Sequence, residues 1–218
     1  MLKNIPLKDI KFILLDMDGT LLDLYFDDYF WGHLVPEKYA EKHDMTFGAA
    51  KDYLYSTYKK HEGTLNWCDI DFWSKELRLD IPALKEQIRH LIEVHPHVVD
   101  FLTLMRKEKK KIFLLTNAHY KTVKLKFSKT QIGKFFDDVL CSFSVGYPKE
   151  YQQFWQGAEK KLGFDRTRSL FIDDTEDVLK SAREFGIRYL LFKAHASSKA
   201  APKQSKEFLT IHDFRELM

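Results

Sequence analysis

Five short runs of apolar residues, each followed by polar residues, constrain the fold of this chain more than any other feature. They are FILLD at 12–16, IFLLTN at 112–117, DVLCS at 138–142, SLFIDD at 169–174 and YLLFK at 189–193. Each run is apolar without alternation, which indicates a strand buried on both faces and hence a parallel sheet. Helical spacing of apolar residues separates the later runs, as over 98–105. Alternating strands and helices predict an α/β core with a doubly wound parallel sheet.

The long interval between the first two runs has a different pattern. Residues 22–94 contain no buried strand but show several helical patterns. Thr46 and Asp80 are expected to cap two of these helices. We therefore predict a helical cap domain over 22–94, inserted into a core made of 1–21 and 95–218. Because open α/β sheets bind ligands at the carboxyl ends of their strands, this cap would cover the ligand site.

The composition excludes several classes of protein. The 218 residues are 44% hydrophobic and 31% charged, which is enough for a core and argues against disorder. A net charge of +3 is too small for an extended nucleic-acid surface. No apolar run is long enough to span a membrane, and residues 1–11 lack the apolar stretch of a signal peptide. Two cysteines without a CxxC motif fit a reduced cytoplasmic protein. The sequence leaves open whether the protein is a monomer or a dimer.

The C-terminal part of the chain carries fewer signals. The stretch KAHASSKAAPKQSK at 193–206 is expected to be a mobile loop because it is polar and lacks periodicity. A short last helix is expected from about Ile211.

Acidic residues follow two of the predicted strands. Asp16 and Asp18 are two positions apart, so in a strand their side chains point the same way, and Gly19 lets the backbone turn away. Asp173 and Asp174 end the fourth run. In a parallel sheet these strand ends lie at one edge, so we expect the carboxylates to meet there. Such a cluster requires a hard cation, and oxygen ligands with room for water and phosphate suit Mg²⁺.

The other strand ends carry groups that suit a phosphate. The hydroxyl of Thr116 and the amide of Asn117 follow the second strand, and Lys149 lies in GYPKE, just past the third. Each residue alone is unremarkable, since Thr-Asn is a common helix cap and an exposed lysine usually only aids solubility. Together with the acids, in order and at strand ends, they are hard to explain by packing and predict a phosphate site.

The stretches DMDGT, LLTN, YPK and FIDD resemble the four motifs of the haloacid dehalogenase-like hydrolase superfamily, whose members are mostly Mg²⁺-dependent phosphatases. The position of the insertion, between the first two motifs, resembles the helical cap of that superfamily, on a Rossmann-like core. The stretches FDDYFWGHLVPE, TLNWCDIDFWSKELRLDI, TNAHY, GYPKE and EFGIRY further resemble the bacterial GMP/IMP nucleotidases of the same superfamily. This second resemblance runs from about residue 12 to 192 and implies a purine 5′-nucleotidase.

The resemblance implies a role for each motif residue. Asp16 would be the nucleophile and form an aspartyl-phosphate. Asp18 would protonate the leaving oxygen and then take a proton from the attacking water. Thr116 and Lys149 would hold the phosphoryl oxygens. The implied ligands of Mg²⁺ are Asp16, Asp18, Asp173 and Asp174, with Asp174 as the expected direct ligand and Asp173 orienting Lys149 or a metal-bound water.

Aromatic residues are dense in the expected cap, and most should form its core, as the helical stripe over 26–34 indicates. The sequence TLNW at 64–67 is different, because Asn66 and Trp67 fall in an expected break between helices, where a side chain can face the cleft. A tryptophan can stack on a base, and an asparagine amide can hydrogen-bond to a purine edge. With the resemblance, this favours GMP or IMP as substrate over a bare sugar phosphate.

Several alternatives remain at this point. A sugar-phosphate phosphatase or a phosphomutase of the same superfamily would share the core and differ in the cap. A dehalogenase needs no general acid at the second acidic position of the first motif, so Asp18 speaks against it. A non-catalytic binding protein is disfavoured because none of the four motifs is lost.

Overall fold

A fully parallel sheet of six strands, in the order β3-β2-β1-β4-β5-β6, forms the centre of the computed structural model, which describes residues 5–218. The strands are β1 (Phe12–Leu15), β2 (Lys111–Thr116), β3 (Asp138–Cys141), β4 (Ser169–Asp173), β5 (Tyr189–Lys193) and β6 (Leu209–Ile211). The first five coincide with the predicted runs, which confirms the doubly wound α/β core. β6 was not predicted, because three residues of the sequence LTI are too short to give a pattern.

The register of the sheet aligns the carboxyl ends of β1, β2 and β4 with one another. Leu15 of β1 pairs with Leu114 on one side and with Ile172 on the other. The chain runs outward from β1 to β3 on one side and from β4 to β6 on the other, so β1 and β4 flank the point where the strand order reverses. Ligands of open α/β sheets bind at this point, beyond the carboxyl ends of the strands.

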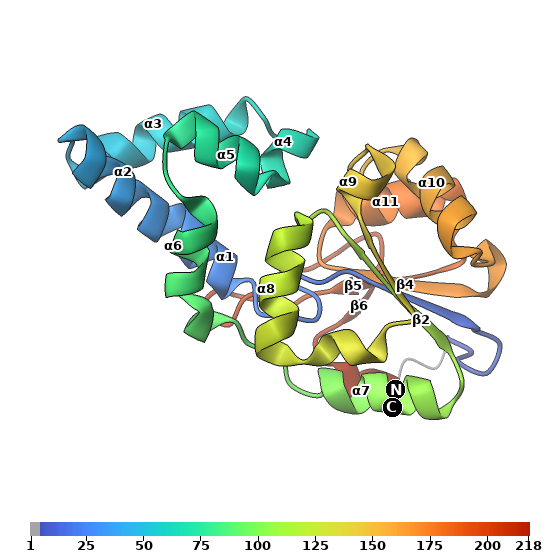
Figure 1. The fold of residues 1–218 in the computed structure, drawn as a ribbon. Coiled ribbons are helices and arrows are strands. Elements are labelled where there is room, and N and C mark those ends of the chain that lie inside the picture. Colours follow the sequence, from blue (N-terminus) through green and yellow to red (C-terminus); the bar gives the residue numbers. More distant parts are fainter. Residues whose placement is uncertain (1–4) are drawn as a thin grey trace.

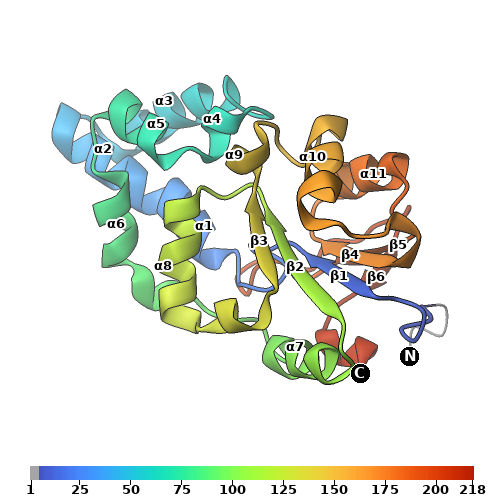
Figure 2. The same ribbon diagram turned by 45° about the vertical axis from the view of Figure 1, so that its right-hand side comes forward.

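Two layers of helices cover the sheet, as Figures 1 and 2 show. Ile13 and Leu15 belong to the same apolar cluster as α7, whereas Leu14 packs in the cluster of α10 and α11. Successive residues of a strand face opposite sides, so continuous apolar runs are what a two-sided core requires. The helices of this part are α7 (Val98–Lys107), α8 (Tyr120–Thr130), η3 (Ile132–Phe135), α9 (Ser142–Val145), α10 (Gln152–Leu162), η4 (Arg166–Arg168), α11 (Glu176–Phe185) and η5 (Phe214–Leu217).

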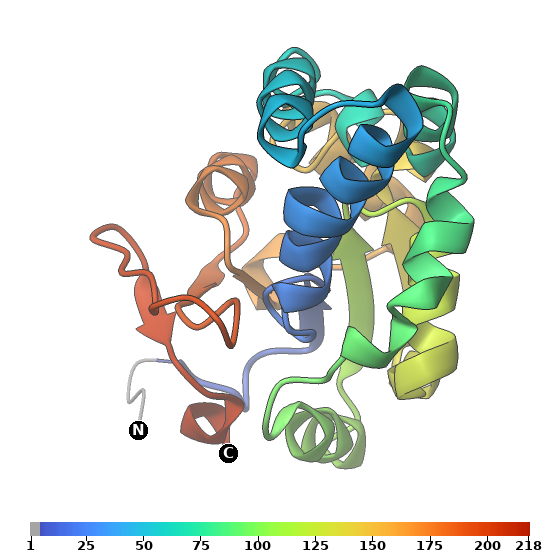
Figure 3. The same cartoon turned by 90° about the vertical axis from the view of Figure 1, so that its left-hand side faces the viewer.

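Residues 22–94, called the helical segment below, form a group of helices beside the sheet (Figures 1 and 3). As predicted, the Thr46 hydroxyl accepts from Ala49 N at 3.3 Å and Asp80 Oδ1 accepts from Ala83 N at 3.0 Å, so both residues cap helices. The helices are α1 (Tyr25–Tyr29), the π-helix η1 (Phe30–Leu34), α2 (Val35–His43), α3 (Phe47–Lys59), α4 (Leu65–Cys68), α5 (Ile70–Leu77), α6 (Ile81–Gln87) and η2 (Arg89–Leu91). Among the described residues, none of the helices combines the length and apolar character that crossing a bilayer requires.

The chain joins the helical segment to the sheet at two linkers, one around Leu22 and one around Val94, and these lie side by side. Leu22 and Val94 form an antiparallel bridge between them. The C-terminal stretch after β5 contacts both linkers, because Ala196 O accepts from Leu24 N at 2.9 Å and lies 3.1 Å from a ring nitrogen of His95. This stretch therefore has defined contacts although it contains no helix or strand between 194 and 208.

The last helix begins later than expected. Ile211 ends β6 instead of starting a helix, and η5 begins at Phe214. Asp213 forms a capping box with Glu216, which fixes the start of the helix after Asp213.

Candidate active site

A cavity of about 710 Å³ lies between the carboxyl edge of the sheet and the helical segment. All seven core residues predicted for the site line it, namely Asp16, Asp18, Thr116, Asn117, Lys149, Asp173 and Asp174. The helical segment contributes aromatic side chains, among them Trp31, Tyr55, Tyr58, Trp67 and Trp73. The cavity thus has a charged floor and an aromatic wall, as a site for a small phosphorylated molecule with a flat ring would need.

Lys149 joins two of the acids at the floor of this cavity. Its Nζ lies 2.5 Å from Asp16 Oδ1 and 2.6 Å from Asp173 Oδ2. All three side chains are buried. Asp16 follows β1, Asp173 ends β4 and Lys149 precedes α10, so the parallel register brings together residues that are up to 157 positions apart.

Three carboxylates converge beside this lysine. One oxygen from each of Asp16, Asp173 and Asp174 can be chosen so that all three lie within 4.8 Å of one another. Gly19 makes the arrangement possible, because a Cβ at this position would lie 2.6 Å from Asp174 Oδ2. Its φ of +83° also lies in the left-handed region that favours glycine. Oxygen donors at this spacing are the set that Mg²⁺ prefers.

The electrostatics of the cluster favour a cation. Burial, only partly offset by the Lys149 ammonium, raises the pKa of Asp16 to about 7. Burial likewise raises the pKa of Asp173 and that of Asp174 to about 6, and the Asp16 charge adds to the rise at Asp174. The pKa of Lys149 is raised as well, since the charges of Asp16 and Asp173 outweigh the effect of its burial, so the lysine stays charged. The floor is therefore short of positive charge.

Thr116 and Asn117 lie where β2 ends, beside Lys149. Asn117 Oδ1 accepts from the backbone N of Lys149 at 2.9 Å, and its Nδ2 donates to Glu150 at 3.0 Å. Asn117 therefore positions the loop that carries Lys149. The buried Thr116 hydroxyl accepts from Ala118 N at 3.0 Å and faces the cavity with its remaining hydrogen-bonding capacity.

Asp18 has a different partner from the other acids. Its Oδ1 accepts from Lys126 Nζ at 2.6 Å, and the same nitrogen bonds Asp27 of the helical segment. Asp27 also accepts from Lys85 at 2.9 Å. The sequence reasoning missed this group. The available signal was that Lys126 lies three positions after the apolar Val123 and so shares the buried face of α8.

Of the two residues predicted to contact a base, only Trp67 lines the cavity. Its side chain is 43% exposed. Asn66 is exposed and lies outside the cavity lining. The expected break between helices is also wrong, because both residues belong to the single turn α4, whose end is fixed by Asp69 capping α5 through Asp71 N and Phe72 N.

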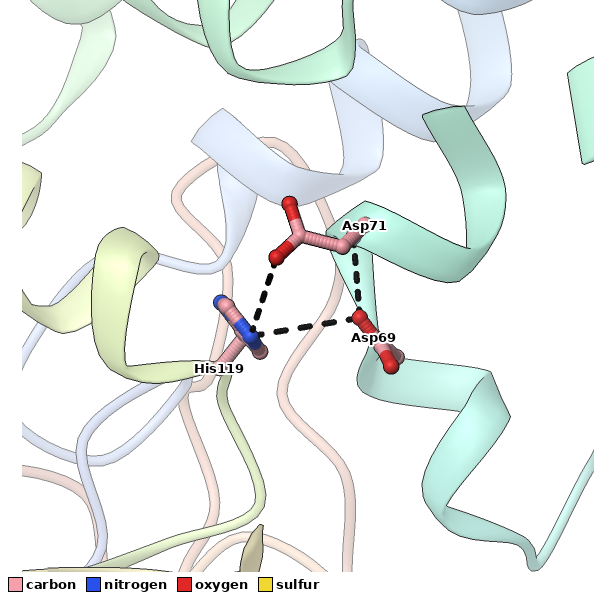
Figure 4. A group of neighbouring side chains, drawn as sticks. All are labelled: Asp69, Asp71 and His119. Atoms are coloured by element: carbon pink, nitrogen blue, oxygen red, sulfur yellow. Dashed lines mark hydrogen bonds and ion pairs between the residues drawn. The ribbon is translucent and has the colours of Figure 1, made fainter. Parts of the chain in front are cut away.

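A second group of acids, shown in Figure 4, lies where α5 meets the start of α8. His119 Nε2 is 3.9 Å from Asp69 Oδ1 and 3.8 Å from Asp71 Oδ2. Lys121 Nζ lies 2.7 Å from both Asp71 oxygens, and Asp69 Oδ1 already accepts two backbone N–H groups. These carboxylates are therefore engaged, and the group holds the helical segment against the core.

Comparison with known proteins identifies close relatives of this chain. Residues 10–186 match the family model of the haloacid dehalogenase-like hydrolases. The chain is 39% identical over 215 residues to the GMP/IMP nucleotidase YrfG of Escherichia coli (strain K12), covering 99% of this chain and 97% of that protein. The protein of the same name from Shigella flexneri matches to the same extent.

Solved structures with lower identity share the fold. The HAD phosphatase from Thermococcus onnurineus superposes with a TM-score of 0.81 at 20% identity, covering 95% of this chain and 96% of that one. A putative beta-phosphoglucomutase from Thermotoga maritima gives a TM-score of 0.69 at 15% identity, with the same coverage. These similarities concern the architecture alone.

Proposed function

Because this chain belongs to the haloacid dehalogenase-like hydrolase family, we propose that it is a Mg²⁺-dependent phosphomonoesterase that acts through an aspartyl-phosphate. The observation that carries the proposal is the contact of Asp16 with Lys149 beside two further buried carboxylates. A nucleophilic carboxylate needs nearby positive charge when it approaches a phosphate dianion. The floor of the cavity holds Lys149, and its clustered carboxylates attract a further cation.

The donor set of Asp16, Asp173 and Asp174 fits Mg²⁺, since all three offer oxygen and stand close together. When bound, Mg²⁺ would offset the charge of the carboxylates and of the phosphate. The side chain of Asp18 is held by Lys126 outside this trio, which supports an acid–base role for it.

The chain's own residues account for the chemical steps in this proposal. A carboxylate oxygen of Asp16 attacks phosphorus and the bond to the leaving oxygen breaks, while Asp18 gives that oxygen a proton. A water then attacks the phosphorus of the aspartyl-phosphate, giving its proton to Asp18 and freeing Asp16. Lys149 and the Thr116 hydroxyl stabilise the charge on the phosphoryl oxygens.

The proposed substrates are the purine nucleoside monophosphates GMP and IMP. Relatives that are 39% identical over nearly the whole chain carry the name GMP/IMP nucleotidase. The cavity offers several aromatic faces, and the half-exposed Trp67 is free to stack on a base. We propose that residues 22–94 act as a cap domain over the core 1–21 and 95–218. We also propose a cytoplasmic location, which the two free cysteines support.

A panel of phosphorylated metabolites, assayed with Mg²⁺ and with EDTA, tests these proposals. GMP and IMP should lead the panel, and activity should vanish in EDTA and return with Mg²⁺. Asp16→Asn should lose activity by several orders of magnitude while Asp52→Asn, at an exposed position in α3, should not. If sugar phosphates are hydrolysed best, the proposed substrates GMP and IMP are wrong but the mechanism stands. Full activity after chelation or in Asp16→Asn would refute the mechanism.

A further inference from the structure

Four side chains of alternating charge form a chain of ion pairs that starts at Asp18, with both lysines buried and both carboxylates partly buried. Lys126 Nζ bonds Asp18 at 2.6 Å and also bonds Asp27, which in turn accepts from Lys85 at 2.9 Å. The side chains of Lys126 and Lys85 are only 1% and 3% exposed. Asp18 and Lys126 belong to the core, whereas Asp27 and Lys85 belong to α1 and α6 of the cap. The chain therefore crosses from the acid–base group into the cap.

The surroundings of this chain are aromatic. Lys85 Nζ lies 4.3 Å from the ring centre of Phe30, and Lys126 Nζ lies 5.1 Å from that of Phe26. Charges taken out of water in this way lose much of what they gain from pairing, so apolar side chains of similar size would serve stability as well. A chain built around two buried lysines is then better explained by the group at its end, the carboxylate of Asp18.

Resting on the proposed function, we propose that Lys126 is a positioning residue that orients Asp18, and that Asp27 and Lys85 hold Lys126 from the cap. Lys126 donates a hydrogen bond to Oδ1 of Asp18. The other oxygen, Oδ2, is then the one that carries the proton for the leaving group. Because two of the four members come from the cap, Asp18 is oriented only when the cap is docked on the core.

A comparison of two leaving groups separates this role from simple attachment of the cap. The value of kcat/KM reports the steps up to departure of the leaving group. A nucleoside leaves as an alkoxide that needs the proton from Asp18, whereas p-nitrophenolate is stable as an anion and leaves without one. Lys126→Met should therefore lower kcat/KM about 10²-fold for GMP, or for whichever alkyl phosphate leads the panel, and less than about tenfold for p-nitrophenyl phosphate.

Two further variants make the result interpretable. Lys121→Met removes another lysine of α8 that pairs with the cap, through Asp71 at 2.7 Å, without reaching Asp18. It should change kcat/KM for both substrates by the same small factor. The double variant Lys126→Met/Asp27→Asn removes one charge of each sign and keeps the remaining pair, Asp18 and Lys85, neutral overall. It should fold even if Lys126→Met does not, and should show the same selective loss.

The outcomes are distinct for the two proposals. Equal losses on both substrates in the Lys126 variants, matching those of Lys121→Met, would show that the lysine only attaches the cap. Unchanged kinetics would also overturn the inference. If the wild-type protein hydrolyses no phosphomonoester with Mg²⁺ present, the proposed function itself fails, and the inference fails with it.

Discussion

The ammonium group of Lys149 lies 2.5 Å from a carboxylate oxygen of Asp16, and both side chains are buried. Asp16 and Asp173 both pair with this lysine and Asp174 lies beside them, so these four residues carry a net charge of 1 − 3 = −2 when all are ionised. A second cation, Lys203, stands 3.6 Å from Asp174, but its side chain is 57% exposed and its charge is largely screened by solvent.

Removal of Lys149 should make the fold depend on metal. Lys149→Met leaves the buried carboxylates of Asp16 and Asp173 without their shared partner, which should lower the free energy of unfolding by about 3–5 kcal/mol in EDTA. Mg²⁺ should restore more stability to this variant than to the wild type, as measured by Tm with and without the ion. Lys203→Met should behave almost as wild type does. The same Mg²⁺-dependent rise of Tm in Lys149→Met and wild type would contradict a shared cation site.

The close approach of Gly19 to Asp174 should be intolerant of a methyl group. In Gly19→Ala the new Cβ would meet Asp174 Oδ2 at 2.6 Å and force the backbone from a φ of +83°. We expect a loss of about 1–2 kcal/mol from the backbone alone and a higher Mg²⁺ concentration for half-maximal activity. Gly48→Ala is the matched control, because nothing lies within 4 Å of its added Cβ in the helix α3. That change should raise stability by about 0.5–1 kcal/mol. Unaltered Mg²⁺ dependence in Gly19→Ala would count against Asp174 as a ligand.

Trp67 should contribute more to binding of the purine base than to binding of the phosphate. Its backbone oxygen accepts from Trp73 Nε1 at 3.0 Å, a bond that Trp67→Ala keeps, so the change is confined to a half-exposed side chain. Loss of stacking worth about 1–3 kcal/mol should lower kcat/KM for GMP and IMP about 10- to 100-fold and largely spare p-nitrophenyl phosphate. The neighbouring Asn66→Ala should change neither value. Equal losses on both substrates in Trp67→Ala would show that Trp67 only supports the packing of the helical segment.

His95 should make the stability of the protein depend on pH. Burial, followed by the positive charge of Lys193, lowers the pKa of His95 from 6.5 to about 4. Between these two pKa values, His95 is therefore protonated in the unfolded chain but neutral in the folded chain. The contribution of His95 to stability is complete above about pH 6.5 and disappears as the pH falls toward 4, a loss of up to about 3 kcal/mol.

Urea unfolding at pH 7 and pH 4.5 measures this effect. His95→Gln can still donate to Ala196 O but does not titrate, so its free energy of unfolding should fall less between these two pH values than that of the wild type. Because all other titrating groups are common to both proteins, the difference isolates His95. Parallel pH profiles for the two proteins would disprove the assignment.

The sequence predicted a residue's position correctly where that position depends only on neighbouring residues in the chain. The strand ends of β1, β2 and β4 share one level, so a run such as SLFIDD places Asp173 and Asp174 without knowledge of the rest of the fold. The caps at Thr46 and Asp80 were predictable for the same reason, since a capping side chain bonds a backbone group three positions away.

Contacts between distant segments were not predictable. Lys126 is one of four lysines in KTVKLKFSKT, and its burial depends on Asp18 and Asp27, which are 108 and 99 positions away. Asn66 is a related case, because it is exposed and absent from the cavity lining although its neighbour Trp67 belongs to that lining. The local pattern around each residue is the same whether it faces solvent or the site.

The paired linkers have a consequence for how this enzyme can diverge. The chain passes between the sheet and the helical segment twice, the two passages lie against each other, and Ala196 is bonded to both. Ser198 adds a further bond, from its backbone N to Asp23 at 3.0 Å. Any movement of the helical segment relative to the sheet would have to strain or break these bonds, and in many enzymes such movements limit turnover. We therefore expect this stretch, which contributes no group to the proposed bond breaking, to influence how quickly substrate is admitted and product released, so that selection at these C-terminal residues could tune turnover while the chemistry is left untouched.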